Sequence, residues 1–170
     1  MDLYALIRDI KDFPTEGILF RDITPLLQDP NGLKESIDRI AEVLQDVDFD
    51  LIVGPESRGF IFGVPVAYKM NKGFVPVRKP GKLPYEHIAQ TYDLEYGTST
   101  IEMHIDAIKK GQKVVIVDDL LATGGTTKAM IDLIEQLGGE IAKIVYLIEL
   151  EALPGREVLK GYEIASLLKY

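Results

Sequence analysis

The segment 114–127 constrains the fold more than any other part of the chain. It reads Val-Val-Ile-Val-Asp-Asp-Leu-Leu-Ala-Thr-Gly-Gly-Thr-Thr, so an apolar, β-branched run ends on two acids and continues through a Gly-Gly loop into helix-forming sequence. Buried strands of this composition are typical of parallel sheets covered on both faces, whose ligands bind beyond the carboxyl ends of the strands. The segment therefore predicts a central parallel strand with a ligand site directly after it.

The residues that follow the predicted strand suit a phosphorylated sugar. Asp118 and Asp119 offer ionised carboxylates, which only accept hydrogen bonds and therefore match the donor hydroxyls of a ribose. Small residues after them let successive backbone N–H groups converge at a helix N-terminus, where a phosphate is favoured. These residues are Thr123, Gly124, Gly125 and Thr126. The acid pair alone, or the small residues alone, would be more typical of an ordinary loop. Their order and spacing together indicate one site for a sugar and its 5′-phosphate.

Two other phosphate-binding motifs are missing from the sequence. A nucleoside triphosphatase requires a G-x-x-x-x-G-K-[ST] loop. Gly54 and Gly59 have the glycine spacing, but Phe60 and Ile61 follow where Lys and Ser or Thr are required. The chain also contains no G-x-G-x-x-G, so the pattern does not favour a dinucleotide site.

Apolar residues along the rest of the chain change repeatedly between helical and strand spacing. Helical spacing covers 3–10, 33–44, 61–70 and 130–137, and runs typical of strands cover 51–53, 74–77, 98–103, 113–117, 144–148 and 164–168. This alternation predicts an α/β fold with a mostly parallel, twisted sheet flanked by helices. We expect a single domain over 1–170, in which the long connections 13–29 and 78–96 form a small N-terminal hood segment and a lid loop over the site.

The composition limits the partners that the protein can have. A formal net charge of −8 argues against a nucleic-acid partner, because nucleic-acid-binding proteins need a basic face. The chain has no cysteine, and hence neither a disulfide framework nor a thiolate metal site. The N-terminus lacks the basic and apolar regions of a signal peptide, and no apolar run is long enough to cross a membrane. We therefore expect a cytoplasmic protein without a membrane partner.

The segment 114–127 resembles the phosphoribosyl pyrophosphate signature of the type I phosphoribosyltransferases, and it is most similar to that of the adenine phosphoribosyltransferases. Further blocks similar to this family occur in the family's order along nearly the whole chain. They are 13–17, 20–25, 57–60, 78–84, 94–97 and 153–157. The resemblance implies a type I phosphoribosyltransferase fold and an enzyme of purine salvage. Such an enzyme transfers the 5-phosphoribosyl group from phosphoribosyl pyrophosphate to adenine, giving AMP and pyrophosphate.

The resemblance also implies a cofactor and a quaternary structure. Mg²⁺ would be bound mainly through the pyrophosphate and ribose hydroxyls of the substrate, which agrees with its preference for oxygen ligands, and we expect no metal site built from protein residues alone. His87 and His104 have no partner at metal-ligand spacing, and we expect structural or surface roles for both. Members of the family are usually dimers, so we expect a homodimer.

The resemblance assigns roles to the residues that would hold phosphoribosyl pyrophosphate. The ribose would lie on Asp118 and Asp119. The 5′-phosphate would be bound by the loop residues Ala122, Thr123, Gly124, Gly125 and Thr126. The pyrophosphate would be bound by Glu56, Ser57, Arg58, Lys79 and Lys82. A cis peptide between Glu56 and Ser57 is also implied, and for Lys82 a solvated basic loop is an equally good interpretation.

The remaining roles concern the base. The polar edge of adenine would be read by backbone groups of Leu19, Phe20 and Arg21, with the Phe20 ring stacking on the purine. Glu95 and Tyr96, in the lid, would be catalytic. Glu95 would either accept the purine proton or stabilise positive charge that develops on the base.

Two alternatives stay open. A regulator could keep this fold and sense phosphoribosyl pyrophosphate while it binds RNA, DNA or a protein, but the acidic balance and the lid motif favour an enzyme. An enzyme could also use hypoxanthine, xanthine or orotate as the acceptor. The block 13–27 favours adenine, because it resembles the adenine pocket of the family.

Overall fold

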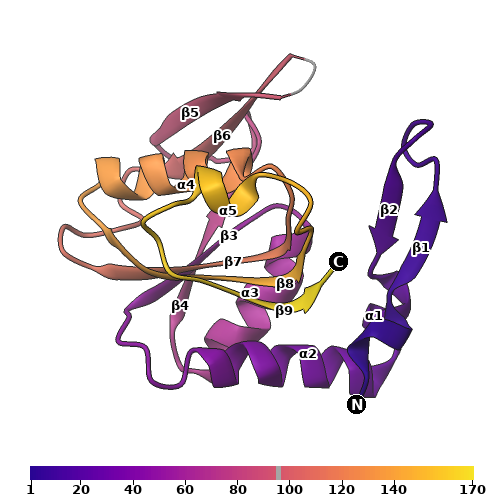
Figure 1. Cartoon of the computed structure of the whole chain (residues 1–170). Helices are drawn as coiled ribbons and strands as arrows, with labels where there is room; N and C mark the ends of the chain where they lie inside the picture. The colour runs from indigo at the N-terminus through magenta and orange to yellow at the C-terminus, as the bar shows by residue number, and fades with distance from the viewer. Residues whose placement is uncertain (95–96) are drawn as a thin grey trace.

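The structure is a computed structural model that describes residues 1–94 and 97–170. At its centre, five parallel strands pair in the order β4-β3-β7-β8-β9 (Figure 1). These strands are β3 (Leu51–Pro55), β4 (Gly73–Val77), β7 (Lys113–Leu121), β8 (Glu140–Glu149) and β9 (Ile164–Lys169). The predicted α/β fold is therefore confirmed, and the strand expected from the segment 114–127 is the central one.

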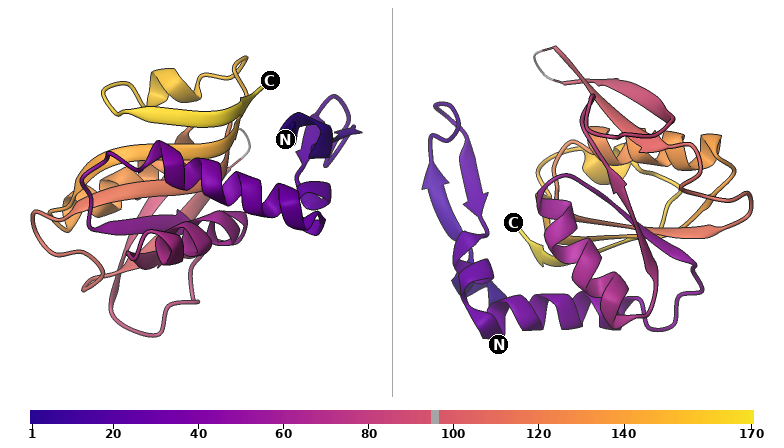
Figure 2. Two further views of the ribbon diagram at one scale, coloured as in Figure 1. Left: turned by 90° about the horizontal axis from the view of Figure 1, so that it is seen from below. Right: turned by 180° about the vertical axis from the view of Figure 1, so that it is seen from behind.

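Helices cover both faces of this sheet (Figures 1 and 2). The helices α2 (Pro30–Val43) and α3 (Arg58–Lys69) lie on one face, and α4 (Gly125–Gln136) and the short α5 (Gly155–Val158) lie on the other. Within β7, Val115 and Val117 pack in the core on the α2 and α3 side, whereas Val114 and Ile116 pack on the α4 side. Since successive side chains of a strand point to opposite faces, β7 is buried on both.

The order in which strands are added to the sheet reverses at β3. The strand β4 pairs on one side of β3, and β7, β8 and β9 follow on the other side. The loop after β3 leads into α3 on one face, and the loop after β7 leads into α4 on the opposite face. Loops that diverge in this way leave a crevice beyond the carboxyl ends of the strands, where ligands of open α/β sheets bind.

The N-terminal segment forms a hairpin that stands apart from the sheet (Figure 2). A short 3-10 helix, η1 (Leu3–Leu6), precedes β1 (Arg8–Lys11), β2 (Leu19–Asp22) and α1 (Thr24–Gln28). The helix predicted over 3–10 is therefore wrong, because the backbone is extended from Ile7 onward and β1 pairs antiparallel with β2. The N-terminal hood segment is present, but β2 and α1 occupy about half of the connection over 13–29 that was expected to be structureless.

A second hairpin, β5 (His87–Asp93) and β6 (Thr98–His104), lies beside α4 (Figure 1). Ile101 and Met103 of β6 are buried in the core, so the base of this hairpin is anchored in the body of the protein. The strand predicted over 98–103 is confirmed, but it pairs with β5 rather than with the central sheet. The lid connection is also shorter than expected, because β5 begins at His87.

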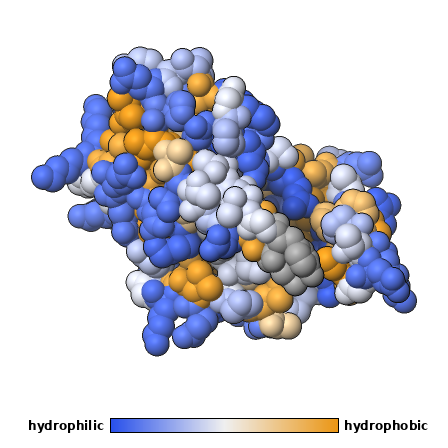
Figure 3. All heavy atoms as spheres, turned by 90° about the horizontal axis from the view of Figure 1, so that it is seen from above, coloured by the Kyte–Doolittle hydropathy of each residue, from blue (hydrophilic) through white to orange (hydrophobic). Residues whose placement is uncertain are grey.

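Polar side chains cover most of the surface seen from above, and apolar patches lie separately between them (Figure 3). Apolar side chains scattered in this way are normal on a folded protein. In the part of the chain that the structure describes, no helix is long and apolar enough to cross a membrane.

Candidate active site

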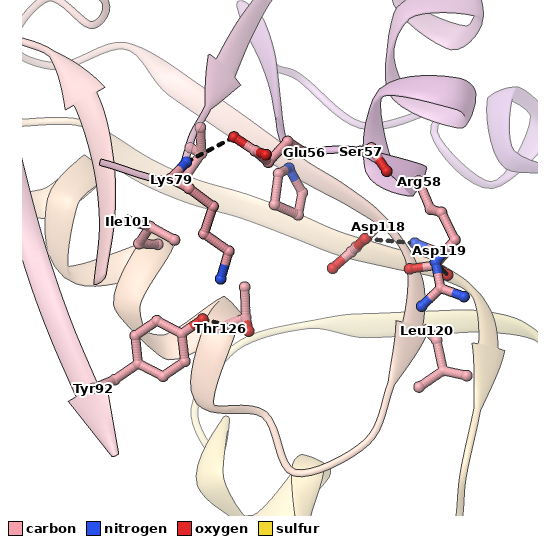
Figure 4. A pocket seen from close by; sticks show the side chains of 12 residues that line it. Glu56, Ser57, Arg58, Lys79, Tyr92, Ile101, Asp118, Asp119, Leu120 and Thr126 are labelled. Carbon is pink, nitrogen blue, oxygen red and sulfur yellow. Dashed lines mark hydrogen bonds and ion pairs between the residues drawn. The ribbon is translucent and has the colours of Figure 1, made fainter. Parts of the chain in front are cut away.

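A pocket of about 230 Å³ opens beyond the carboxyl ends of β3 and β7 (Figure 4). Its walls come from the ends of these strands, from the loop after β4, from the hairpin β5-β6 and from the start of α4. The lining residues are Pro55, Glu56, Ser57, Arg58, Val77, Lys79, Tyr92, Ile101, Asp118, Asp119, Leu120 and Thr126. Acidic and basic side chains from different elements thus face one another across one space.

The end of β7 holds two carboxylates in a buried position. Asp118 is 9% exposed and Asp119 is 6% exposed. Oδ1 of Asp118 accepts a hydrogen bond from the backbone N–H of Asp119 at 2.8 Å. Burial, followed by the neighbouring charge of Asp119, raises the pKa of Asp118 well above its usual value of 3.8. Two acids held this close with little water favour a ligand that brings hydrogen-bond donors or positive charge.

One oxygen of Asp119 has no hydrogen-bond partner. Within residues 1–94 and 97–170, Oδ2 of Asp119 is the only buried side-chain nitrogen or oxygen of this kind. Nε of Arg58, at the start of α3, lies 2.9 Å from this oxygen, which is close enough for an ion pair but is not aligned for a hydrogen bond. Buried polar atoms are normally hydrogen-bonded, so an oxygen in a pocket wall without a hydrogen bond indicates a ligand with a donor, such as a hydroxyl group.

The loop between β7 and α4 borders a second, smaller space. This cavity of about 90 Å³ is lined by Asp118, Leu120, Leu121, Ala122, Thr123, Gly124, Gly125, Thr126 and Thr127. Gly124 has a φ of +85°, which side-chain-bearing residues rarely adopt, and α4 begins directly after it. The first N–H groups of a helix have no partner within the helix and attract anions. Because both spaces are lined by Asp118, Leu120 and Thr126, one ligand can extend from the larger space into the smaller.

The loop after β3 carries a carboxylate that basic residues hold in place. Glu56 is joined to Ser57 by a cis peptide, as the family resemblance implied. Its carboxylate accepts hydrogen bonds from the backbone N–H of Lys79 at 2.7 Å and from Nζ of Lys82 at 2.5 Å. Burial raises the pKa of Glu56, but the hydrogen bonds from Lys82 and Lys79 outweigh burial, and the net shift is downward. Glu56 therefore stays ionised and fixes the basic loop at the edge of the pocket.

The hairpin β5-β6 contacts the polar groups of the pocket directly. The side chain of Lys79 points into the pocket (Figure 4). Its Nζ donates to Oγ of Ser99 on β6 at 2.8 Å. On β5, the hydroxyl of Tyr92 is hydrogen-bonded to Oγ1 of Thr126 at 3.0 Å. The loop before α4 and the basic loop after β4 are thus both connected to the hairpin.

Known proteins resemble the chain over its whole length. Residues 22–163 match the family model of the phosphoribosyl transferase domain. An adenine phosphoribosyltransferase of Lachnoclostridium phytofermentans is 67% identical over 99% of this chain and 97% of its own. A crystal structure of adenine phosphoribosyltransferase from Thermoanaerobacter pseudethanolicus is 54% identical, with a TM-score of 0.97 over 99% of this chain and 98% of that one. The chain belongs to the adenine phosphoribosyltransferase family.

A crystal structure with ligands is also similar to this phosphoribosyltransferase. It is the adenine phosphoribosyltransferase of Saccharomyces cerevisiae in complex with an imino-altritol bisphosphate and adenine. The sequences are 40% identical, and the TM-score is 0.90 over 96% of this chain and 95% of that one. That relative therefore holds adenine together with a doubly phosphorylated sugar analogue on the same fold.

Most residues predicted for the sugar and the pyrophosphate lie together in this phosphoribosyltransferase. Those that line the larger pocket are Glu56, Ser57, Arg58, Lys79, Asp118, Asp119 and Thr126. Those that line the smaller cavity include Ala122, Thr123, Gly124 and Gly125. Lys82 lines neither space, because its ammonium group is bonded to Glu56. The predicted catalytic residues Glu95 and Tyr96 lie outside the described residues.

The residues predicted for the base lie in the hood, outside the larger pocket. The ring of Phe20 packs edge-on against Phe13 at 5.0 Å, and the guanidinium of Arg58 lies 5.4 Å from the Phe20 ring centre. Arg21 is bonded to Asp9 at 2.5 Å and stacks on the ring of Tyr170, so its side chain is already engaged. Leu19 is 43% exposed. Phe20 is thus the hood residue with a contact to the pocket wall.

Several residues of the pocket carry no motif in the sequence. Tyr92 and Ile101, which come from the two strands of the hairpin β5-β6, are among them. A signal did exist for β5, because half-buried residues alternate with exposed ones along its whole length. Ile88, Gln90 and Tyr92 share one face of this strand, but the polar Gln90 hides the apolar alternation.

The acids at the end of β7 have the chemistry of ligands for a metal ion that is shared with a substrate. Among residues 1–94 and 97–170, no group of three or more His, Cys, Asp or Glu side chains could hold a metal ion. Mg²⁺, however, is commonly bound through one or two carboxylates together with substrate phosphates. Asp118 and Asp119, one oxygen of which lacks a hydrogen bond, fit a metal ion that arrives with a phosphorylated substrate.

Proposed function

We propose that this phosphoribosyltransferase transfers the 5-phosphoribosyl group of phosphoribosyl pyrophosphate to adenine, forming AMP and releasing pyrophosphate. The observation that carries the proposal is the buried oxygen of Asp119 that lacks a hydrogen bond, close to the loop 122–126 that follows β7. A ribose 5-phosphate group has hydroxyls for the acids and a phosphate for the loop. The ligands of the yeast relative, a sugar-analogue bisphosphate and adenine, support this choice.

In this proposal, Asp118 and Asp119 accept hydrogen bonds from the ribose hydroxyls, and the N–H groups of 122–126 bind the 5′-phosphate. Fixing the sugar at both ends holds its anomeric carbon opposite the base and makes the reaction effectively unimolecular. Because Asp118 has a raised pKa, ionisation of both acids together is helped by positive charge or donors from the ligand.

Arg58 and Lys79 bind the pyrophosphate, with Lys82 and the loop carrying Glu56 and Ser57 at the edge of the pocket. When the bond between the anomeric carbon and the pyrophosphate oxygen breaks, its electron pair stays on pyrophosphate. These cations stabilise the charge that develops there. A purine nitrogen forms the new bond to the anomeric carbon, and its proton passes to a base, for which Glu95 is the candidate. Mg²⁺ bound through the substrate and the two Asp residues would supply further charge neutralisation.

Adenine is read by the backbone of Leu19, Phe20 and Arg21. Among the strands of residues 1–94 and 97–170, β2 pairs only with β1, so one edge of β2 has no partner strand there. Adenine presents a donor at its 6-amino group and an acceptor at N1, and a fixed C=O and N–H pair on that edge would match both. Hypoxanthine presents the opposite polarities and would leave the backbone groups unpaired.

We also propose that Glu95 and Tyr96 are catalytic, that residues 1–170 form one domain, and that the protein is a cytoplasmic homodimer. These roles come from the family resemblance. For Glu95 we expect that Glu95→Gln lowers turnover more than ground-state binding, because its carboxylate would act chiefly in the transition state. An effect on the Michaelis constant alone would assign Glu95 to substrate binding instead.

The experiment that tests the function is a coupled assay of pyrophosphate release. The protein is incubated with phosphoribosyl pyrophosphate, Mg²⁺ and, in separate reactions, adenine, hypoxanthine, xanthine or orotate. We expect release with adenine and a preference of around 10⁴-fold over hypoxanthine, the size found for sites that hydrogen-bond their substrate. Tight binding of phosphoribosyl pyrophosphate without release for any base would support a regulator and contradict the proposal.

A further inference from the structure

The motif at 153–157 resembles the family but takes no part in the site described above. It forms the turn before α5 and most of α5. Gly155 is buried, and a Cβ at this position would lie 2.6 Å from the carbonyl oxygen of Ala122. In the loop 122–126, called the phosphate loop below, a Cβ on Gly124 would lie 3.2 Å from the carbonyl oxygen of Gly155. The start of α5 and the back of the phosphate loop are therefore packed backbone against backbone.

An ion pair with two hydrogen bonds holds α5 in this place. Nε of Arg156 donates to Oε1 of Glu149 at 2.5 Å, and Nη2 donates to Oε2 at 3.0 Å. The hydroxyl of Ser166 on β9 donates to the same Oε2 at 2.5 Å. Glu149 is only 3% exposed, so its carboxylate depends on these donors rather than on water. The planar fork of Arg fits this geometry, and the single ammonium of Lys cannot reproduce it.

Glu149 is in turn fixed to the strand from which the phosphate loop departs. It is the last residue of β8 and pairs in register with Leu121, the last residue of β7. The backbone N–H of Leu150 donates to the carbonyl oxygen of Leu121 at 3.0 Å. A continuous connection therefore runs from the end of β7 through Glu149 and Arg156 to Gly155 and back to the loop.

We propose that Arg156 is a positioning residue for the 5′-phosphate. Its pairing with Glu149 keeps Gly155 against Ala122 and Gly124, and the loop thereby keeps the backbone arrangement that binds the phosphate. Arg156 borders neither described cavity, so it acts through the backbone of the loop and not by touching the substrate. The inference rests on the proposed function, because it requires that the loop binds the 5′-phosphate.

Two substitutions disturb this contact from opposite sides. Arg156→Lys keeps the positive charge but loses the two-pronged bond to Glu149. Gly155→Ala keeps the ion pair but adds a methyl group. Its carbon would lie 2.6 Å from the carbonyl oxygen of Ala122, so the loop has to move. Gly155 does not have a positive φ, so alanine adds no backbone strain of its own. The matched control is Arg39→Lys, which alters an ion pair with Glu35 at 2.9 Å on α2.

The readout is the affinity of the full chain for two fragments of the substrate, measured by calorimetry with Mg²⁺. We expect both variants to bind ribose 5-phosphate about tenfold to a hundredfold more weakly, because a misplacement of about 1 Å can cost on the order of a hundredfold. Pyrophosphate, which does not use this loop, should bind unchanged. The amide resonances of Gly124 and Gly125 should shift in both variants, and Arg39→Lys should leave both affinities unchanged.

The inference is overturned if both variants bind ribose 5-phosphate as tightly as the unaltered protein, since Arg156 then serves stability alone. A parallel loss of affinity for ribose 5-phosphate and pyrophosphate would also overturn it, because the damage would be general. If the unaltered protein binds pyrophosphate but not ribose 5-phosphate, the proposed phosphate site is wrong, and the inference fails with it. The unaltered protein thus separates the two failures.

Discussion

The two halves of the candidate site are supported in different ways. Asp118 and Asp119, proposed to bind the sugar, lie near the carboxyl end of β7. This strand is paired with β3 on one side and β8 on the other, and it is buried on both faces. The hood residues for the base lie on β2, which pairs only with β1 within its sheet. Large apolar side chains of that hairpin, such as Phe13 and Ile18, are exposed. Few buried contacts make local opening easier, so we expect a rigid sugar site and an adaptable base site.

The largest effect should come from removing both charges of the rigid half. Replacing Asp118 and Asp119 with Asn keeps their size but removes two charged acceptors. Each hydrogen bond to a charged group contributes about 1.5–3 kcal/mol, so we expect catalytic efficiency to fall by roughly 10² to 10⁴ while the fold persists. The assay is steady-state pyrophosphate release, with circular dichroism to check folding. Asp48→Asn, at a strongly exposed position, is the control. Unchanged activity of the double variant would show that the ribose lies elsewhere.

A smaller loss should follow when the phosphate loop is forced out of shape. Gly124→Val places a β-branched side chain at a φ of +85°, where side-chain-bearing residues are disfavoured by roughly 1–2 kcal/mol, and in contact with Gly155. We expect affinity for AMP to fall at least about tenfold, because the added side chain displaces the loop from the phosphate as well as straining the backbone. Gly111→Val has a matching φ of +86° with open space around it, so it separates backbone strain from the site. Equal AMP affinity in the two variants would show that the loop does not bind the phosphate.

In the adaptable half, we expect a moderate effect that depends on the side chain. Phe20→Ala removes the ring proposed to stack on adenine, and because such contacts contribute about 0.5–1.5 kcal/mol, the Michaelis constant for adenine should rise up to about tenfold. Ile18→Ala in the same hairpin is the control. Arg21→Ala should keep the preference for adenine, because its side chain is engaged by Asp9 and Tyr170. In a competition assay, equal use of hypoxanthine by Arg21→Ala would refute backbone reading by β2.

The smallest effects should appear in stability, with opposite signs in the two halves. The raised pKa of Asp118 means that the folded state keeps a proton that the unfolded state releases near 3.8, so this group lowers stability as pH rises above that value. Asp22, at the end of β2, has a pKa lowered to about 2, chiefly by its side-chain hydrogen bond with Thr24, so its contribution is lost as pH falls from 3.8 towards 2.

At neutral pH, Asp118→Asn should therefore raise the midpoint of thermal unfolding, and Asp22→Asn should lower it. The difference in unfolding midpoint from the unaltered protein should shrink for Asp118→Asn as the pH is lowered towards 3.8, and for Asp22→Asn as it is lowered from 3.8 towards 2. Thermal unfolding followed by circular dichroism as a function of pH measures them. The same sign for both variants at neutral pH would contradict the contrast between the two halves.

The rigid half could be read from the sequence because its signals are local. A β-branched run, two acids and a glycine loop occupy consecutive positions, and each of them determines its own conformation with little help from distant residues. Asp118, Asp119 and Gly124 were therefore placed correctly on one strand and loop. The prediction of a parallel sheet followed from the same kind of evidence, the regular alternation of strands and helices.

The parts that were wrong or missed depend on pairing between distant residues. The helical spacing of Leu3, Leu6, Ile7 and Ile10 is real, but pairing of β1 with β2 determines the conformation from Arg8 onward. Tyr92 reaches Thr126 from a strand that is half exposed and outside the central sheet. The sequence does not show which partner either strand contacts, because such pairings are set by tertiary packing.

Most cations in and beside the pocket are paired with acids of the protein, whereas Lys79 is hydrogen-bonded to the neutral Ser99. Lys82 and Arg78 are paired with Glu56, and Arg58 is paired with Asp119. A polyanion that enters the site therefore replaces ion pairs within the protein by ion pairs with itself. It displaces few anions of the solution, because few of the cations lack an acidic partner. We expect its affinity to depend only weakly on salt concentration, in contrast to sites where unpaired Lys and Arg release their condensed anions on binding. Pyrophosphate would leave by the reverse exchange, as Glu56 and Asp119 take back their partners.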